Sequence, residues 1–172
     1  KIDSSVERII QTAKISDLCG AESMTFHAAF YMKDSPFDVF DLVEKSMNVI
    51  EERLSRLDIE IELRPELTGK TSQFGSIEEL MSLTKKVSSC NPCMDFSHLY
   101  ARTGKYNTYE EFCEVLDILS NELGRKALDN MHIHISGVSS NSKGDLKHLN
   151  LEDSDFNWKD LVRSLKKSDC KG

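Results

Sequence analysis

The sequence predicts an α/β protein of the (β/α)8, or TIM, barrel class. Short apolar runs alternate with amphipathic helical segments along the 172 residues, an order typical of parallel strands joined by crossover helices. Acids and histidines follow four successive predicted strands, and barrel enzymes assemble their sites from several strand ends. No Gly-x-Gly-x-x-Gly or Gly-x-x-x-x-Gly-Lys-Ser/Thr motif is present to favour a doubly wound sheet.

Four strands are expected, near residues 23–27, 59–63, 92–96 and 130–136, within a single domain that spans residues 1–172. The second of them alternates isoleucine and leucine with glutamate, which is typical of a half-buried strand. Four strands make half of a barrel that needs about 250 residues. We therefore expect the chain to cover four to five βα units, with further strands before Lys1 and after Gly172 or with an open half-barrel.

Helices are expected over residues 4–20, 36–54, 76 onward, 108–124 and from Ser154 or Asp155 to 165. Ser4, Ser76 and Thr108 each precede a glutamate by three residues, which is the spacing of a capping box. The segments 100–106 and 145–148 are expected to be loops.

Composition excludes some classes of protein. The formal net charge is −7, which argues against nucleic-acid binding through a broad basic surface but not through a local loop or through bound metal ions. No apolar stretch approaches the roughly 18 residues of a membrane helix. Five cysteines lack the spacing of a disulfide framework, and the pair Cys90 and Cys93 is interpreted as structural. A monomer in the cytoplasm, away from membranes, is the simplest interpretation.

The five histidines indicate a metal site. His27, His98, His132 and His134 lie in or just after predicted strands, and His148 follows the last of them. Two acids, Glu66 and Asp95, lie at equivalent strand ends. Imidazole and carboxylate are the usual ligands of Zn²⁺, and Mn²⁺ or Mg²⁺ are alternatives.

Two longer motifs resemble the endonuclease IV family. The segment Pro65–Gly75 is similar to the family's Glu-x-Thr-x-Gly…Ser-x-x-Gly segment, and Cys93–His98 with Ala101 and Gly104 is similar to Cys-Ile-Asp-x-x-His-x-x-Ala. Phe26-His27, Met131-His132 and the 145–148 segment resemble shorter family motifs. The resemblance implies an apurinic/apyrimidinic endonuclease with a trinuclear zinc site in a (β/α)8 barrel.

The resemblance also implies roles for individual residues. His27 would bind the first zinc, and Glu66 would bridge the first and second and act in catalysis. Asp95 and His132 would bind the second zinc, and His98 and His148 the third. His134 is expected to replace a ligand or to orient one, because strand periodicity places it on the same face as His132.

The sequence departs from the family pattern at three places. A ligand histidine on an earlier strand and a glutamate on the eighth strand have no counterpart. The third-zinc aspartate should lie two residues before His148, where Leu146 stands, and Asp145 is one position away. Two to three ions are therefore expected.

Three functions remain open from the sequence. The first is zinc-dependent cleavage of double-stranded DNA 5′ to abasic sites, in DNA repair, with DNA contacts from Ser72, Tyr100, Arg102 and Lys105. An ordinary solvated loop explains residues 100–106 equally well. The second is a sugar isomerase or epimerase with one or two divalent ions. The third is a non-catalytic relative with an incomplete site.

Overall fold

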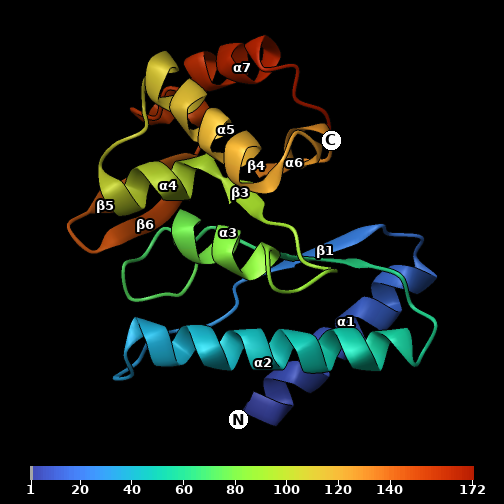
Figure 1. The fold of residues 1–172 in the computed structure, drawn as a ribbon. Coiled ribbons are helices and arrows are strands. Elements are labelled where there is room, and N and C mark those ends of the chain that lie inside the picture. The colour runs from blue at the N-terminus through green and yellow to red at the C-terminus, as the bar shows by residue number, and fades with distance from the viewer. Residues whose placement is uncertain (1) are drawn as a thin grey trace.

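The computed structural model describes residues 2–172, in which helices alternate with short strands (Figure 1). The elements in chain order are α1 (Ile2–Leu18), β1 (Ser23–Phe26), α2 (Pro36–Ser55), β2 (Glu62–Pro65), α3 (Ile77–Thr84), β3 (Cys93–Asp95), α4 (Phe96–Thr103), α5 (Tyr109–Leu123), α6 (Lys126–Asp129), β4 (His132–His134), β5 (Gly137–Asn141), β6 (Gly144–Leu149), the 3₁₀ turn η1 (Leu151–Asp153) and α7 (Trp158–Lys167). None of the helices formed by residues 2–172 combines the length and apolar character needed to cross a bilayer.

The first four strands run parallel in the order β1-β2-β3-β4. Strand β1 pairs with β2 from Ser23 opposite Glu62 onward, and β3 pairs with β4 from Cys93 opposite His132 onward. Two parallel bridges, Leu63 with Cys90 and Glu66 with Cys93, join β2 to β3. The row has the strand order and direction of half a (β/α)8 barrel, and its sheet is not closed.

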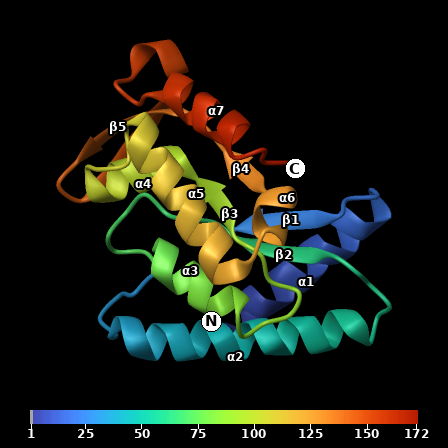
Figure 2. The ribbon, with the colours of Figure 1, turned by 45° about the horizontal axis from the view of Figure 1, so that its top comes forward.

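Helices cover one face of this row and polar side chains occupy the other. Because successive residues of a strand face opposite sides, Leu63 and Pro65 point to the helices while Glu62, Arg64 and Glu66 share the opposite face. The apolar side forms a core with α1, α2, α3, α5 and α7 (Figure 2). Its largest fully buried side chains include Phe74, Phe96, Phe112, Phe156, Ile10, Met47 and Ile50.

Capping motifs in the sequence predict several helix starts correctly. The capping boxes at Ser76 and Thr108 are confirmed, with each side chain accepting from the backbone N–H three residues on. Ser35 caps α2 in the same way, ahead of Pro36 at the first helical position.

Other boundaries differ from the expectation. Helix α1 already includes Ser4, so the expected start at this residue is wrong. Strand β2 lies at 62–65, not 59–63, because β1 offers only four residues for pairing. Helix α7 begins at Trp158 and not at Ser154 or Asp155, since the Ser154 hydroxyl is engaged with the backbone of Val138 and Asn157 provides the cap.

Two segments expected to be loops are regular structure. Residues 96–103 form α4, which Asp95 caps and Gly104 ends in the left-handed conformation. Residues 137–149 form the antiparallel hairpin β5–β6, which packs beside α4. The hairpin therefore holds His148 on strand β6 and not in a loop.

Gly144 is where the hairpin meets the loop after β2. Its φ is +109°, and an added Cβ would lie 2.0 Å from the Gly69 carbonyl oxygen. Gly144→Ala is expected to lower the free energy of unfolding by strain and by this collision. Gly124→Ala is the matched control, because Gly124 has φ +82° but open space around it. Urea unfolding should show an extra loss of about 1–3 kcal/mol at Gly144; equal losses would contradict the close packing.

Candidate metal centre

Histidines and carboxylates from several elements meet at the carboxyl ends of the parallel strands. His27 follows β1, Glu66 follows β2, and Asp95 and His134 end β3 and β4. His98 lies in the first turn of α4, and His148 comes from β6. Parallel strands end at one edge of a sheet, so residues far apart in the sequence become neighbours there.

Glu66 is at the centre of this cluster. Its Oε1 lies 2.9 Å from His134 Nδ1 and 3.6 Å from His98 Nδ1, and its Oε2 lies 3.3 Å from His27 Nε2. The carboxylate is only 11% exposed. Burial alone would raise the pKa of Glu66, but hydrogen bonds from His27 and His134 outweigh it and lower the pKa to about 2. Glu66 is therefore ionised over the whole physiological range.

Asp95 and His98 are held rigidly. Asp95 Oδ1 accepts from the His98 backbone N–H at 2.8 Å, and the Asp95 side chain caps α4. Burial raises the pKa of Asp95, and the negative charge of Glu66 adds to this. His98 Nδ1 lies 2.9 Å from the Leu67 carbonyl oxygen, which leaves Nε2 facing outward.

His98 Nε2 contacts His148 on the other side of the site. It lies 3.3 Å from His148 Nε2, with ring centroids 5.5 Å apart. Two imidazole nitrogens at this separation suit a shared ion, since Zn²⁺ binds nitrogen at about 2.0–2.1 Å.

A β-bulge brings Asp145 toward the same site. Ser139 pairs with Lys147 but Ser140 pairs with Asp145, so Leu146 is an extra residue in β6. In a regular strand, residues 145 and 148 would face opposite sides, and the bulge changes that relation. The negative charge of Asp145 contributes to the raised pKa of His27, after the dominant hydrogen bond that His27 donates to Glu66. The extra residue in β6 therefore changes the face on which Asp145 lies relative to His148.

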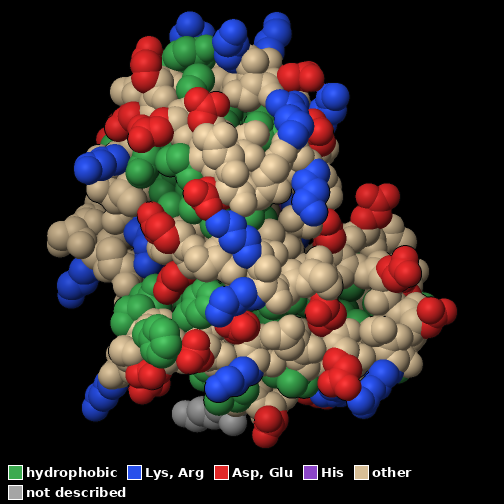
Figure 3. Space-filling model, viewed as in Figure 1, with side chains coloured by type: hydrophobic (Ala, Val, Ile, Leu, Met, Phe, Trp, Pro, Cys, Tyr) green, Lys and Arg blue, Asp and Glu red, His purple; other side chains and the backbone are tan. Residues whose placement is uncertain are grey.

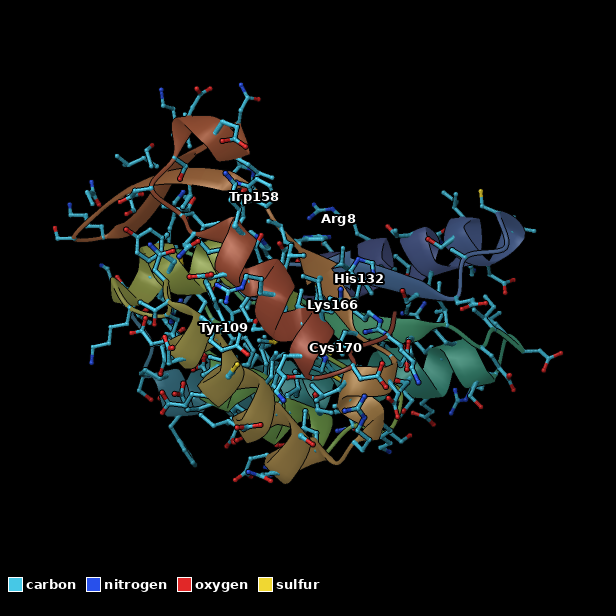
Figure 4. All side chains as sticks on the ribbon, turned by 90° about the horizontal axis from the view of Figure 1, so that it is seen from above. Arg8, Tyr109, His132, Trp158, Lys166 and Cys170 are labelled. Carbon is cyan, nitrogen blue, oxygen red and sulfur yellow. The ribbon has the colours of Figure 1, made fainter. Side chains whose placement is uncertain are left out.

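The structure distinguishes His132 from His134. Asp95 pairs with His134 and Cys93 pairs with His132, so His132 lies one strand period deeper. His132 lines a cavity of about 320 Å³ together with Arg64 and Glu62, and it also faces the C-terminal residues 170–172 (Figure 4). Burial lowers the pKa of His132, with added effects of His134 and Arg64. Of these two histidines, His134, which was expected to replace a ligand or to orient one, is the one that contacts Glu66.

The donor set fits divalent cations. Single donor atoms of His27, Glu66 and His98 lie within 4.8 Å of one another, as do those of Glu66, Asp95 and His134 and those of Cys93, His132 and His134. The negative charge of Glu66 raises the pKa of the buried Asp95, so the two carboxylates repel each other. A bound cation would relieve this repulsion.

The four residues expected to contact DNA differ in their exposure and in their contacts. Ser72 and Lys105 are exposed. The Tyr100 hydroxyl donates to Asp155 at 2.7 Å, and its ring packs on Phe156. Arg102 turns inward to the loop after β2.

Three residues beside the site, Cys90, Cys93 and Ser97, have contacts or burial that indicate structural roles. Burial raises the pKa of both the Cys90 and Cys93 thiols to about 12, which suits the structural interpretation of this pair. Ser97 is a further structural residue: its hydroxyl donates to the Ser136 carbonyl and accepts from the Ser136 N–H, both at 2.8 Å. This exchange fixes the start of α4 against the end of β4, and no local motif signals it.

A half-barrel with histidines and carboxylates gathered at its strand ends defines a protein of the (β/α) barrel class with a candidate metal site. The chain belongs to the xylose isomerase-like TIM barrel family, whose model matches residues 1–172. This confirms the fold class expected from the sequence.

Relatives and solved structures agree with the motif resemblance. The chain is 39% identical over 173 residues to an uncharacterized protein of Methanocaldococcus jannaschii, covering 100% of this chain and 63% of that protein. It is 24% identical over 146 residues to a probable endonuclease 4 of Aster yellows witches'-broom phytoplasma, covering 83% of this chain and 49% of that protein. The chain thus spans between about half and two thirds of these relatives.

Two solved structures share the fold. Endonuclease IV from Thermus thermophilus matches with a TM-score of 0.69 and 23% identity, over 94% of this chain and 56% of that one. A 3-keto-D-glucoside 4-epimerase from E. coli matches with a TM-score of 0.64 and 15% identity, over 97% and 60%. Fold similarity therefore includes both nucleases and sugar epimerases.

Proposed function

We propose that this protein is a metal-dependent phosphodiesterase that cleaves double-stranded DNA on the 5′ side of abasic sites. The observation that carries the proposal is the position of Glu66, within 3.6 Å of imidazole nitrogens from His27, His98 and His134. The names of the endonuclease 4 relative and the endonuclease IV structure support the same chemistry.

The residues divide into two groups of ligands. His27, Glu66, Asp95 and His134 would hold ions around the central carboxylate, with His134 in the role that the motif suggested for His132. His98, His148 and Asp145 would hold a further ion. Bound divalent ions supply positive charge for the scissile phosphate and activate water.

The protein's own groups orient this set. The Leu67 carbonyl accepts a hydrogen bond from His98 Nδ1, which leaves Nε2 as the nitrogen that can bind an ion. The Asp95 cap and the Ser97–Ser136 exchange keep α4 in register with β4. Such prior organisation removes the need to order the ligands when ions and substrate bind.

The charge distribution is compatible with DNA as a substrate. Acidic and basic side chains are interspersed on the face formed by α2, α3 and α5 (Figure 3). DNA would meet the protein through the strand-end loops and bound ions, which the net charge of −7 does not include.

A sugar epimerase is the second candidate, favoured by the 3-keto-D-glucoside 4-epimerase structure. Such enzymes use one or two divalent ions. The contact of His98 with His148 favours the nuclease, because it offers ligands for an ion beyond the two that Glu66 and Asp95 could hold.

Metal analysis and a nicking assay test the proposal together. The purified full-length protein should contain two to three ions of zinc per chain, with Mn²⁺ as an alternative. It should also nick a duplex with one abasic site on the 5′ side of the lesion. Chelation should abolish nicking and added Zn²⁺ should restore it. Protein that retains metal but leaves the abasic duplex intact would overturn the nuclease assignment and favour a sugar substrate.

A further inference from the structure

The loop that follows Glu66, residues 67–75, closes around one cation of the protein itself. Arg102 Nη1 lies 2.5 Å from the Lys70 carbonyl oxygen, 3.1 Å from that of Gln73 and 3.3 Å from that of Thr68. It also lies 3.1 Å from the Thr68 hydroxyl. Four oxygens of one loop therefore converge on a single nitrogen.

This convergence is costly without a positive charge. Carbonyl dipoles that point at a common centre repel one another, and the buried Thr68 has no bulk water to compensate. Hydrogen bonds from a charged donor are about twice as strong as neutral ones. The guanidinium thus occupies a niche that resembles a cation site.

Arg102 and His98 hold the loop from the same helix. They are four residues apart on α4 and so lie on one helix face. His98 Nδ1 meets the carbonyl of Leu67, and Arg102 meets that of the next residue, Thr68. The ligand histidine and the arginine therefore grip adjacent peptide groups immediately after Glu66.

The other sides of the loop are also braced. Ser72 accepts from the Tyr31 N–H, and Thr71 donates to Lys143 of the β5–β6 turn. The Tyr31 hydroxyl donates to Glu79 at 2.8 Å and lies 3.4 Å from Arg102 Nη2. What remains exposed is the tip, Lys70, Thr71 and Ser72.

We infer that Arg102 is a positioning residue for this tip: it holds Lys70, Thr71 and Ser72 in the conformation that contacts the phosphates of the substrate strand beside the metal ligands. The inference rests on the proposed function. It replaces the expectation that Arg102 touches DNA, because its Nη1 is already surrounded by loop oxygens.

Kinetics of substituted protein test the inference. In Arg102→Met the KM for an abasic duplex should rise about 10-fold while kcat stays within about threefold of wild type, and metal content should not change. Arg102→Lys should recover most of the KM, because an ammonium can occupy the position of Nη1. Arg56→Gln is the control, since this arginine is 72% exposed and pairs only with Glu52 on α2 among the described residues. A wild-type KM in Arg102→Met, or loss of metal or of kcat alone, would overturn the inference.

Hydrogen exchange separates this inference from the proposed function. Amides of residues 68–75 should exchange at least about 10-fold faster in Arg102→Met than in wild type or Arg102→Lys. If wild-type protein fails to nick DNA, the proposed function fails while faster exchange still upholds Arg102 as the clamp of this loop. Equal exchange rates in the two variants and wild type would reject the clamp whatever the activity.

Discussion

Glu66→Gln is expected to reduce the rate of nicking by about 1,000-fold, the upper end of the range for removing one stabilising group from a preorganised site. Glu66 contributes the ionised oxygens around which His27, His98 and His134 gather. Glutamine keeps the volume but replaces one oxygen with an NH2 group, which cannot bind a cation. Nicking of an abasic duplex and metal content, both measured against wild type, give the result.

The matched control for this change is Glu114→Gln on the exposed face of α5. Both variants lose one negative charge, so a general electrostatic effect would appear in both. Circular dichroism should show an unchanged fold in each, because Glu66 lies at a strand end outside the apolar core. Unimpaired nicking in Glu66→Gln would show that its assignment to the site is wrong.

The second large effect should separate His134 from His132. His134→Ala is expected to weaken metal binding by about 100-fold, at least as much as the loss of an outer partner of a ligand. Its Nδ1 lies 2.9 Å from Glu66, whereas His132 lies one strand period deeper beside Cys93. His132→Ala should therefore bind metal and nick DNA nearly as wild type does. Zinc titration of both variants measures the difference.

The reverse outcome has a clear meaning. If His132→Ala loses metal and His134→Ala retains it, the motif-based assignment of His132 is right and the assignment of His134 as a ligand is wrong. Losses of similar size in both variants would favour an ion shared by Cys93, His132 and His134, whose donor atoms also lie within 4.8 Å of one another.

Local sequence was sufficient for the four parallel strands and for most of the helices between them, but not for α4 or the β5–β6 hairpin. Capping residues lie within three positions of the helix starts that they define, and the period-two pattern marks buried strands without reference to the rest of the chain. The motif around Asp95 and His98 is also a local signal, because the capping residue and the histidine lie within one turn at the start of α4. The fold class and the proximity of Asp95 to His98 were therefore predictable.

How deep a side chain lies in the site, and which residues it contacts, depend on contacts between distant segments of the chain. His132 and His134 share a face by periodicity, so the sequence could place both near the site but could not tell them apart. The pairing of Asp95 with His134 places His134 nearer the strand end. The position of Asp145 depends on the extra residue in β6, and no residue type in this segment predicts that bulge. Arg102 was visible as a basic residue in a loop-like segment, yet its partners are carbonyl groups 29 to 34 residues earlier. A pattern along the chain determines which way a side chain faces, whereas register and long-range hydrogen bonds determine what it meets.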